Sequence, residues 1–524
     1  MHRNSFSRLP TLQKLREHPI LILLIVNILV GLITFQNYGL SWDEPLFYDY
    51  ANALQYAYSP SEWFSGNFDL QNAYGSSGTD HANRGPAYIL IARPLVSIVE
   101  SLGIDNASAW HLVNFLTFQL GVYFFYRFAV KWMNRTAALT VSAFFSWQPL
   151  LWGHAFINPK DMPFLVFFTG AMCFGFEMVD DLAQNGKAKF AKIFIAAFFL
   201  GIAASIRVLG PLAAILTGLY AVSQLNRINF IELTKHFAIY AILTLLIAFI
   251  AWPYLWTSPL QKFIEVFGFM SDNPTQLTVL FNGQQYKADE LPRRYLPVLL
   301  GYTLTEPVWL LFIPGLVVGF WKSNNRKRIA LFLTLLWFFI PTTYAILKQP
   351  PMYDGFRHFL FMLPPVFVFS GFAVEQLAAL IKSNWVKIAL FAAILAFGII
   401  PSIQLHPYQY SYYNSFIGGT TGAFRQYETE YWLTCYREAT LRLNKVAPAG
   451  SQLFVRREPY MAAYYANPNI TIRDFRTEEK DMQTGDYYLV NTRSNEDLKF
   501  LRDQPAFIRV SRQGVNFCLI KQVP

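Results

Sequence analysis

Two acidic motifs combine residue types that can carry out group transfer at a membrane surface. The first motif, Ser41-Trp-Asp-Glu-Pro45, directly follows the first long apolar run and holds the adjacent carboxylates Asp43 and Glu44. A carboxylate at this position can act as a general base on a hydroxyl group. The aromatic residues Trp42 and Tyr48 offer faces that suit a sugar ring or a lipid head group. The alternative interpretation is a helix cap followed by an interfacial aromatic belt.

A second motif, Asn158-Pro-Lys160-Asp161-Met-Pro163, places another acid at the start of a long apolar run. An aspartate beside proline is also typical of an ordinary helix N-terminus. The functional interpretation is a second acid that faces Asp43 across a pocket, with Lys160 as a neighbouring cation.

Basic residues beside the apolar runs complete this pattern. Arg207 interrupts one run, Arg357-His358 opens another, and Arg84 precedes a further apolar segment. An ionisable residue at membrane depth is costly, which makes it a functional candidate. Arginine binds phosphate through its bidentate fork, whereas the alternative is that each side chain snorkels to the interface. Acids beside arginines on the outer face fit a phosphate-bearing lipid as substrate and a hydroxyl as its reaction partner.

The elements that must position these residues are membrane helices. The 524 residues are 54% hydrophobic and only 15% charged, whereas soluble proteins carry roughly 25% charged residues. Runs of about twenty apolar residues, each long enough to cross the hydrocarbon core, recur from Ile20 onward. A soluble enzyme, a disordered chain and a collagen-like fibre are therefore excluded. We predict eleven spans, near residues 19–38, 110–130, 136–153, 162–182, 190–206, 208–225, 236–255, 296–320, 329–347, 357–380 and 384–402.

Two apolar segments need a separate interpretation. The stretch 190–225 would exceed about 50 Å as one helix, so a break is predicted between residues 207 and 211, where Gly210-Pro211 occurs. The segment 86–103 holds Arg93-Pro94 in its middle, and we interpret it as a helix that lies at the membrane interface.

The basic residues predict the orientation of the chain. With eleven spans and a cytoplasmic N-terminus, every short cytoplasmic loop carries lysine or arginine, as the positive-inside rule requires. The net charge of +10 is therefore a topology signal, and no nucleic-acid partner is expected. The basic start, Met1 to Arg16, precedes a span without a small-residue cleavage site, so we expect an uncleaved anchor.

Three segments are then expected outside the cytoplasm. The loops 39–109 and 256–295 belong to a membrane module of residues 1–402. The tail, residues 403–524, is polar and has alternating strand patterns, which predicts a small soluble α/β domain. We expect the loop 256–295 to be mobile and to close over the substrate, with residues 278–290 contributing, because long loops are usually functional. The expected fold class is a polytopic α-helical membrane protein with a small C-terminal extracytoplasmic α/β domain.

Cysteine and histidine spacing gives no signature of a metal site. Cys173, Cys435 and Cys518 are too few for a disulfide framework and contain no CxxC pair. No metal and no cofactor are therefore predicted, and a divalent cation held by Asp43, Glu44 and a histidine stays open as an alternative.

The order, spacing and sidedness of these motifs resemble those of the GT-C glycosyltransferases, in particular the dolichyl-phosphate-mannose protein mannosyltransferase-like group (glycosyltransferase family 39). The aminoarabinose lipid A transferase is a bacterial relative of that group. The phrase Asn158-Pro-Lys-Asp161-Met-Pro-Phe resembles the second acidic motif of bacterial members. Tyr427-Glu-Thr-Glu-Tyr-Trp432, followed by Tyr436-Arg-Glu438, resembles a phrase after their last span. The resemblance covers most of residues 20–440, and the tail after about residue 450 departs from the eukaryotic enzymes.

This resemblance implies an inverting glycosyltransferase of the plasma (inner) membrane. Such an enzyme moves a sugar from a polyprenyl-phosphate donor to a hydroxyl on an envelope glycan, lipid or protein outside the cytoplasm. Asp43 would be the base, Glu44 its assistant and Asp161 the acid of the second loop. The expected phosphate ligands are Arg207, Arg357, Lys160 and Arg84, and the expected sugar or lipid contacts are Trp42, Tyr48 and His358.

Two other functions remain as alternatives. A transporter or flippase of a lipid-linked sugar commonly shows internal repeats and ionisable residues near the bilayer midplane. Here no repeat is visible and the acids cluster at one surface. A non-catalytic scaffold, whose exported tail binds a partner, would keep its function in the isolated tail.

Overall fold

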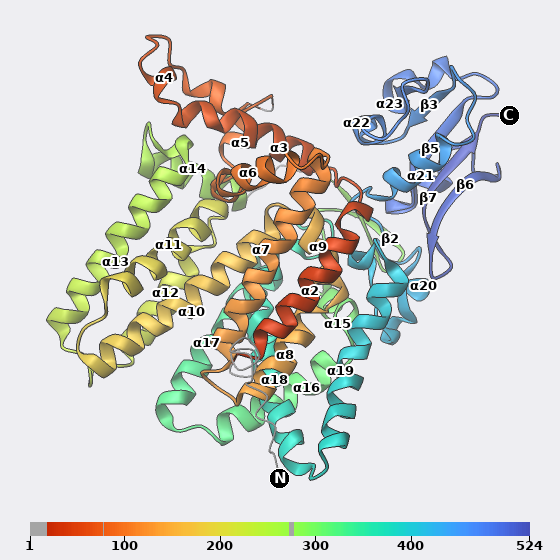
Figure 1. The fold of residues 1–524 in the computed structure, drawn as a ribbon. Helices are drawn as coiled ribbons and strands as arrows, with labels where there is room; N and C mark the ends of the chain where they lie inside the picture. The colour runs from red at the N-terminus through yellow and green to blue at the C-terminus, as the bar shows by residue number, and fades with distance from the viewer. Residues whose placement is uncertain (1–17, 77, 272–276) are drawn as a thin grey trace, which may run out of the picture.

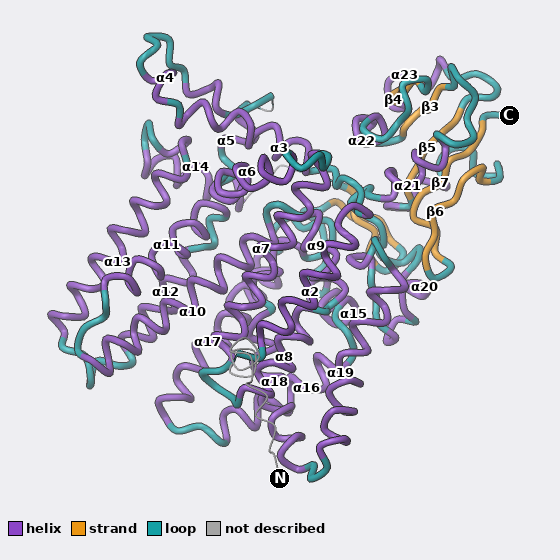
Figure 2. Tube along the Cα trace, viewed as in Figure 1, coloured by secondary structure: helices purple, strands orange, loops and turns teal. Residues whose placement is uncertain are grey.

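The computed structural model describes residues 18–76, 78–271 and 277–524, and it is predominantly helical (Figure 1). The expected anchor, Met1 to Arg16, lies outside these residues. Within them, strands occur in one hairpin and in the C-terminal domain (Figure 2).

The apolar runs of the sequence form the helices of a large bundle. Their bounds are α2 (Ile20–Thr34), α7 (Asn106–Ala129), α8 (Arg135–Ser146), α9 (Pro149–Ile157), α10 (Asp161–Asn185), α11 (Phe190–Ile206), α12 (Pro211–Val222), α13 (Phe230–Ala251), α15 (Tyr295–Thr303), α16 (Pro307–Trp321), α17 (Asn325–Lys348), α18 (Pro364–Leu380) and α19 (Asn384–Leu405). The break predicted in the stretch 190–225 is confirmed, since α11 ends at Ile206 and α12 begins at Pro211. Proline suits the first turn of a new helix because it has no N–H to donate.

Several of these helices are shorter than a bilayer is thick. Among the described residues, five are long and apolar enough to cross alone: α2 with its 3-10 extension (Phe35–Asn37), α10, α13, α17 and α19. The pair α15 and α16 passes the same test only together and is bent by 106°. The chain is thus a multi-pass membrane protein. Proline at several helix starts divides apolar runs that the sequence presents as continuous, so several predicted spans consist of two shorter helices. The count of eleven spans therefore stays a prediction.

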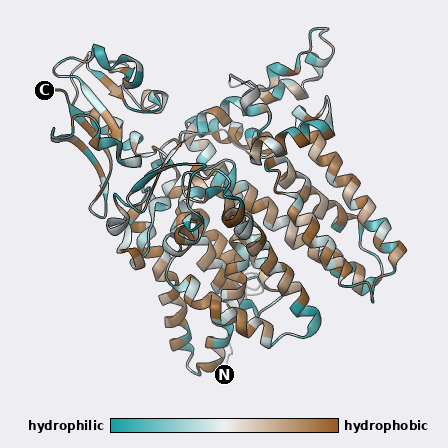
Figure 3. Cartoon of the chain, turned by 180° about the vertical axis from the view of Figure 1, so that it is seen from behind, coloured by the Kyte–Doolittle hydropathy of each residue, from teal (hydrophilic) through white to brown (hydrophobic). Residues whose placement is uncertain are grey.

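The bundle is organised around α10. Of its apolar window, 89% is buried, compared with 17% for α13 and α19. Helix α10 packs against α7, α11 and α12, and its first turn contacts the 3-10 helix η5 (Arg357–Met362). Helices α13 and α19 lie at the periphery (Figure 1) and expose aliphatic side chains such as Leu245 and Ile403. In Figure 3, where the cartoon is seen from behind and coloured by hydropathy, the helices of the bundle are largely brown, that is, hydrophobic. The first residue of α10, Asp161, is also buried.

The first loop, residues 39–109, folds into short helices at one end of the bundle. They are α3 (Glu44–Ala53), η2 (Leu54–Tyr58), α4 (Pro60–Trp63), η3 (Leu70–Ala73), α5 (Thr79–Ala82) and α6 (Ala87–Glu100). Helix α6 corresponds to the segment predicted at the interface. Its 14 residues expose Ile91, Leu95 and Ile98 along one side, which is the pattern of a helix with one apolar face. Its location at a membrane surface stays a prediction.

The second outer loop, residues 256–295, contains a helix and a hairpin. Helix α14 (Pro259–Ser271) is followed by β1 (Thr278–Phe281) and β2 (Gln284–Lys287), which pair antiparallel. Asn282 and Gly283 form the turn with φ of 53° and 75°, as a two-residue hairpin of this sequence requires. The hairpin packs against the C-terminal domain, where Ser494 Oγ donates to the Thr278 carbonyl at 3.0 Å.

The C-terminal domain is a mixed α/β unit, as predicted. Its elements are α20 (Gly419–Ala423), α21 (Cys435–Leu443), β3 (Gln452–Val455), α22 (Pro459–Ala463), β4 (Thr471–Asp474), α23 (Phe475–Glu478), β5 (Tyr487–Asn491), β6 (Ala506–Arg512) and β7 (Val515–Gln522). In the described part, the sheet has the order β4-β3-β5-β7-β6, in which β4, β3 and β5 are parallel and the other pairs antiparallel. One face, with Phe454 and Tyr488, has its own small core, and the other, with Leu453 and Leu489, joins the main core.

Two of the three cysteines form a disulfide that the sequence did not reveal. Cys435 in α21 is bonded to Cys518 in β7, 83 residues later, and Cys173 is buried and free. The sequence spacing carries no signal of this pair, because only the fold brings α21 against the sheet. A structural disulfide is typical of a compartment outside the reducing cytosol.

The two ends of the bundle differ in what they carry. The helices of the first loop and the C-terminal domain lie at one end, and the short links between α12 and α13, α16 and α17, and α18 and α19 lie at the other (Figure 1). This arrangement brings the two acidic motifs and the tail to the same end of the molecule.

Candidate active site

Asp43 precedes α3, in the short connection that follows the first apolar helix. Ser41 Oγ donates to the Ile157 carbonyl at 2.8 Å, and the Trp42 N–H donates to the Trp432 carbonyl at 3.2 Å. These two bonds fix the connection between the end of α9 and the C-terminal domain. The Asp43 side chain is 16% exposed, and its Oδ2 lies 3.0 Å from Arg357 Nη1.

Asp161 is held by its own local turn and by two arginines. The Asn158 side chain accepts from the backbone N–H of Lys160 and Asp161 at 3.1 and 2.8 Å, and its amide donates to Asp161 Oδ2 at 2.9 Å. This is the side-chain-to-backbone pattern that asparagine offers before a helix. Asp161 also pairs with Arg207, and its Oδ2 lies 3.1 Å from Arg357 Nη1.

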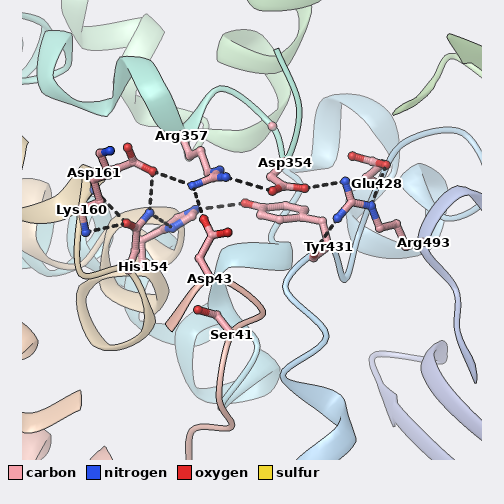
Figure 4. A network of polar contacts seen from close by, with 12 residues as sticks. Ser41, Asp43, His154, Lys160, Asp161, Asp354, Arg357, Glu428, Tyr431 and Arg493 are labelled. Atoms are coloured by element: carbon pink, nitrogen blue, oxygen red, sulfur yellow. Dashed lines mark hydrogen bonds and ion pairs between the residues drawn. The ribbon is translucent and has the colours of Figure 1, made fainter. Parts of the chain in front are cut away.

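A single guanidinium therefore joins the two sequence motifs. Arg357 Nη1 contacts both Asp43 and Asp161, as Figure 4 shows. The two acids meet at this shared cation. Arg357 is 4% exposed at its side chain, so the three charged groups lie in an environment where unpaired charge is costly.

Asp354 is a third acid of this cluster that the sequence reasoning did not single out. It is fully buried, and its Oδ2 lies 3.3 Å from Arg357 Nη2. Its Oδ1 lies 2.7 Å from Arg493 Nη2. Burial raises the pKa of Asp354, and the two arginines oppose that rise. The only sequence signal was its place three residues before Arg357.

The C-terminal domain supplies two further members, Glu428 and Arg493. Arg493 begins the 3-10 helix η9 (Arg493–Leu498), directly after strand β5, and its Nη1 donates to the Tyr431 carbonyl at 3.0 Å. Its Nε lies 3.6 Å from Glu428 Oε1. Glu428 belongs to the segment Tyr427–Trp432, which carries part of the family resemblance. Nothing in the sequence marked Arg493, which lies more than 60 residues further along the chain.

A cavity of about 310 Å³ opens beside these charges. Its polar end includes five of the predicted residues together with the proposed base: Asp43, Arg84, Lys160, Arg207, Arg357 and His358. Most of the other lining residues are apolar, and α12, α14 and α17 supply Leu212, Val266, Phe267, Met270 and Ile340 among them. The cavity thus combines a cationic end with an aliphatic and aromatic wall.

Two arginines of the cavity have hydrogen-bond donors that could bind an anion. The Nε donors of Arg207 and Arg357 are buried and, within the described residues, have no hydrogen-bond acceptor. Burial, reinforced by the positive charges of Arg207 and Arg84, holds the pKa of Lys160 well below its usual range. An anion would satisfy the open donors and favour the charged form of this lysine.

Four predicted residues do not line the cavity. One of them, Asp161, belongs to the charged cluster described above, and the other three lie elsewhere. Glu44, Trp42 and Tyr48 are not among the described residues that line the cavity. Glu44 is fully buried and accepts from the Ser41 N–H and the Tyr48 hydroxyl, each at 2.6 Å. Tyr48 stacks on Trp110 with ring centroids 4.7 Å apart. The reason is geometric, because residues 43 and 44 enter α3 and adjacent side chains on a helix diverge by about 100°.

The structure separates the side chains of the alternative metal site, in which Asp43, Glu44 and a histidine would hold a divalent cation. Asp43 contacts Arg357, whereas Glu44 faces the buried His111 at 3.2 Å. Among the described residues, the close group of possible ligand atoms is Glu430 with Cys435 and Cys518, whose sulfurs bond each other. The expectation that the protein needs no metal stays a prediction.

The chain was compared with known proteins. No protein-family model matches it, and no curated protein matches it in sequence. Among solved structures it is similar to ArnT from Cupriavidus metallidurans in the apo state, with a TM-score of 0.48 and 14% identity over 95% of this chain and 97% of that chain. The corresponding values for ArnT bound to undecaprenyl phosphate are 0.47, 13%, 96% and 97%.

A further likeness is to the Archaeoglobus fulgidus oligosaccharyltransferase in complex with Zn and sulfate. Here the TM-score is 0.43 and the identity 12%, over 85% of this chain and 62% of that chain. At these scores and identities, no residue role is carried over from these proteins.

Proposed function

We propose that this protein is a GT-C type glycosyltransferase that moves a sugar, with inversion, from a polyprenyl-phosphate donor to an acceptor hydroxyl. The acceptor is an envelope glycan, lipid or protein on the extracytoplasmic face of the plasma (inner) membrane. The order and spacing of the two acidic motifs in the sequence support this class.

The observation that carries the proposal is the composition of the cavity. The carboxylate of Asp43, the three cations Arg84, Lys160 and Arg207, and an apolar wall line the same cavity. A polyprenyl-phosphate sugar needs the same three environments: a base for the incoming hydroxyl, positive charge for the phosphate and an apolar surface for the isoprenoid chain. Arg207 lines this cavity, and its buried Nε has no hydrogen-bond acceptor among the described residues, so it could donate to a phosphate.

The chemistry follows from this arrangement. Asp43 takes the proton of the acceptor hydroxyl, and the oxygen attacks the anomeric carbon from the face opposite the phosphate. A new glycosidic C–O bond forms while the anomeric C–O bond to phosphate breaks, and both electrons leave with the phosphate. Arg207, Lys160 and Arg84 stabilise the charge that grows on the leaving phosphate. The products are an inverted glycoside and the polyprenyl phosphate.

The other two predicted acids, Asp161 and Glu44, position the residues that carry out the reaction. Asp161 binds Arg207 and Arg357 and so sets the direction of both cations. Glu44 ties the Ser41 backbone to Tyr48 inside the protein, so we assign it the support of the Asp43 backbone in place of direct assistance to the base. Removal of such a support would lower stability before it changed the chemistry.

A transfer assay tests the proposal. The purified full chain in nanodiscs is incubated with a panel of polyprenyl-phosphate sugars, and sugar release or transfer is followed by mass spectrometry. One donor should turn over with the wild type, and Asp43→Asn should lower kcat by about 100-fold or more because the base is lost. Asp49→Asn is the matched control, since Asp49 lies on the same helix and accepts from Ser76 at 2.7 Å.

The outcomes separate the alternatives. Full transfer by Asp43→Asn would exclude Asp43 as the base. Binding of a donor without turnover, together with engineered cysteines that become accessible alternately from both faces, would favour a flippase. No binding of any donor would remove the proposed substrate class.

A further inference from the structure

The contacts of Arg493 lead from the C-terminal domain to the proposed base (Figure 4). Arg493 Nη2 lies 2.7 Å from Asp354 Oδ1, and Asp354 Oδ2 lies 3.3 Å from Arg357 Nη2. Arg357 Nη1 lies 3.0 Å from Asp43 Oδ2. Four charged groups of alternating sign thus form a continuous chain that starts in the tail and ends at the cavity.

We propose that Arg493 is a positioning residue for glycosyl transfer, which acts through Asp354 and Arg357 on Asp43. This inference rests on the proposed function of the cavity. It makes the C-terminal domain a part of the active site, because the domain supplies the last cation of the chain.

The sharing of Arg357 explains why a second arginine is needed. Arg357 faces three carboxylates, those of Asp43, Asp161 and Asp354. Arg493 lies closer to Asp354 than Arg357 does, at 2.7 Å compared with 3.3 Å. Arg493 is therefore the nearer of the two cations that stabilise the Asp354 charge. Without Arg493, the fully buried Asp354 would compete with Asp43 for Arg357, because a buried carboxylate without a partner is strongly destabilised.

A second contact connects Arg493 to the same loop. Its guanidinium lies over the Trp42 ring, 5.3 Å from the centroid, and cations are attracted to such a ring face. Trp42 directly precedes Asp43 in the chain. Arg493 thus holds Asp43 from two sides, through the charge chain and through the packing of the neighbouring residue. The predicted role of Trp42 as a sugar contact stays a prediction, and its contact with Arg493 adds a role in supporting the loop.

Other contacts hold the C-terminal domain in place when Arg493 is changed. The Leu40 N–H donates to the Tyr465 hydroxyl at 2.9 Å, and the Tyr460 hydroxyl donates to the Trp42 carbonyl at 2.8 Å. The Tyr464 hydroxyl donates to Asp105 Oδ1 at 3.1 Å. A substitution of Arg493 is therefore expected to leave a folded, docked domain in which the position of Asp43 is altered.

Steady-state kinetics with four full-length variants test this role. In Arg493→Gln, kcat should fall by about tenfold or more while the KM for the donor changes less than about threefold, because the cavity cations Arg84, Lys160 and Arg207 are untouched. Arg493→Lys keeps the charge without the fork and should lie between Arg493→Gln and the wild type. Arg502→Gln, at an exposed position of the same domain, is the control and should keep wild-type kcat.

The fourth variant combines Arg493→Gln with Asp354→Asn. Removal of both charges leaves no buried acid to draw Arg357 away, so kcat should recover by at least about threefold relative to Arg493→Gln alone. A merely structural role of Arg493 would give additive losses in place of recovery. Thermal unfolding checks that each variant is folded, and Arg493→Lys decides the question if Arg493→Gln does not fold.

The outcomes distinguish this inference from the proposed function. Turnover by the wild type, with kcat unchanged in Arg493→Gln or in a folded Arg493→Lys, would overturn the inference alone. Absence of turnover by the wild type with every donor would overturn the proposed function and the inference together. Loss in Arg493→Gln with recovery in the double variant would establish the positioning role.

Discussion

At the scale of single residues, the candidate site depends on which carboxylates each buried arginine contacts. Arg357 bridges Asp43 and Asp161, and Arg493 meets Asp354 and Glu428 behind it. Each arginine has a planar fork that can serve two carboxylates at once, which a lysine cannot do. Buried acids that share cations in this way are sensitive to any change of charge among them.

Glu428 should make the stability of the protein depend on pH. Burial raises its pKa to about 7, and Asp354 adds to the rise while Arg493 opposes it. Tyr413 and Tyr295 also face this carboxyl. The folded state therefore holds the proton above the usual pKa of 4.5. Ionisation between about pH 4.5 and 7 then costs stability, which falls as pH rises through this window.

The variant Glu428→Gln removes this titration. We expect the Tm of the wild type to fall relative to that of Glu428→Gln between pH 5 and 8, by the equivalent of about 2–3 kcal/mol. Thermal unfolding in one detergent at several pH values measures it. Glu479→Gln, at an exposed position of the same domain, is the control. Parallel pH profiles for the wild type and Glu428→Gln would contradict the assignment.

At the scale of elements, the break between α11 and α12 and the start of α6 determine where the cavity cations lie. Arg207 follows α11 with an extended backbone, and Arg84 stands three residues before α6. Gly85 lies against the end of α11, where an added Cβ would come within 1.9 Å of the Ser205 carbonyl oxygen. The close approach of two backbones thus brings Arg84 and Arg207 into one cavity.

Gly85→Ala should therefore disturb the cation pair. Because the neighbouring atom is backbone, the two segments must separate, and overpacking of this kind costs about 1–3 kcal/mol. We expect a lower Tm and a donor KM raised by about tenfold or more, measured by thermal unfolding and the transfer assay. Gly218→Ala on α12, where a Cβ has open space, should leave both values near those of the wild type. An unchanged KM for Gly85→Ala would show that the spacing of the two cations is unimportant.

The expected closure of the loop 256–295 over the donor stays a prediction, and the structure shows which elements of this loop lie beside the cavity. Residues 278–290 include the hairpin, which contacts the C-terminal domain, and the described residues of that hairpin do not line the cavity. Helix α14, earlier in the same loop, supplies Val266, Phe267 and Met270 to the cavity wall. Any closure over the donor would therefore involve α14, and deletion of 278–290 would act on the tail.

At the scale of the whole molecule, the first loop and the C-terminal domain occupy one end of the bundle and the short basic links the other (Figure 1). We expect the first end outside the cytoplasm, since the links carry the lysines and arginines. The Cys435–Cys518 disulfide in the tail agrees with an oxidising compartment.

Cysteine labelling in intact cells tests this orientation. The natural cysteines give little background because Cys173 is buried and the others are bonded. Lys480→Cys, exposed in the tail, should react with a membrane-impermeant maleimide from outside. Lys187→Cys, exposed in the link between α10 and α11, should react only after permeabilisation. The reverse pattern would place the candidate site in the cytoplasm.

The sequence by itself determined the membrane class, the apolar helices, the break between α11 and α12, the α/β tail and both acidic motifs. Each of these depends on composition or on the spacing of residues close in the chain. A long apolar run forms a membrane helix, and proline ends or starts a helix, whatever the rest of the fold is. Only the tertiary structure decided that Glu44 faces away from the cavity, that Cys435 bonds Cys518, and that Arg493 reaches Asp354. These facts depend on contacts between distant segments, and the pairing of buried charges over such distances leaves no periodic trace in a single sequence.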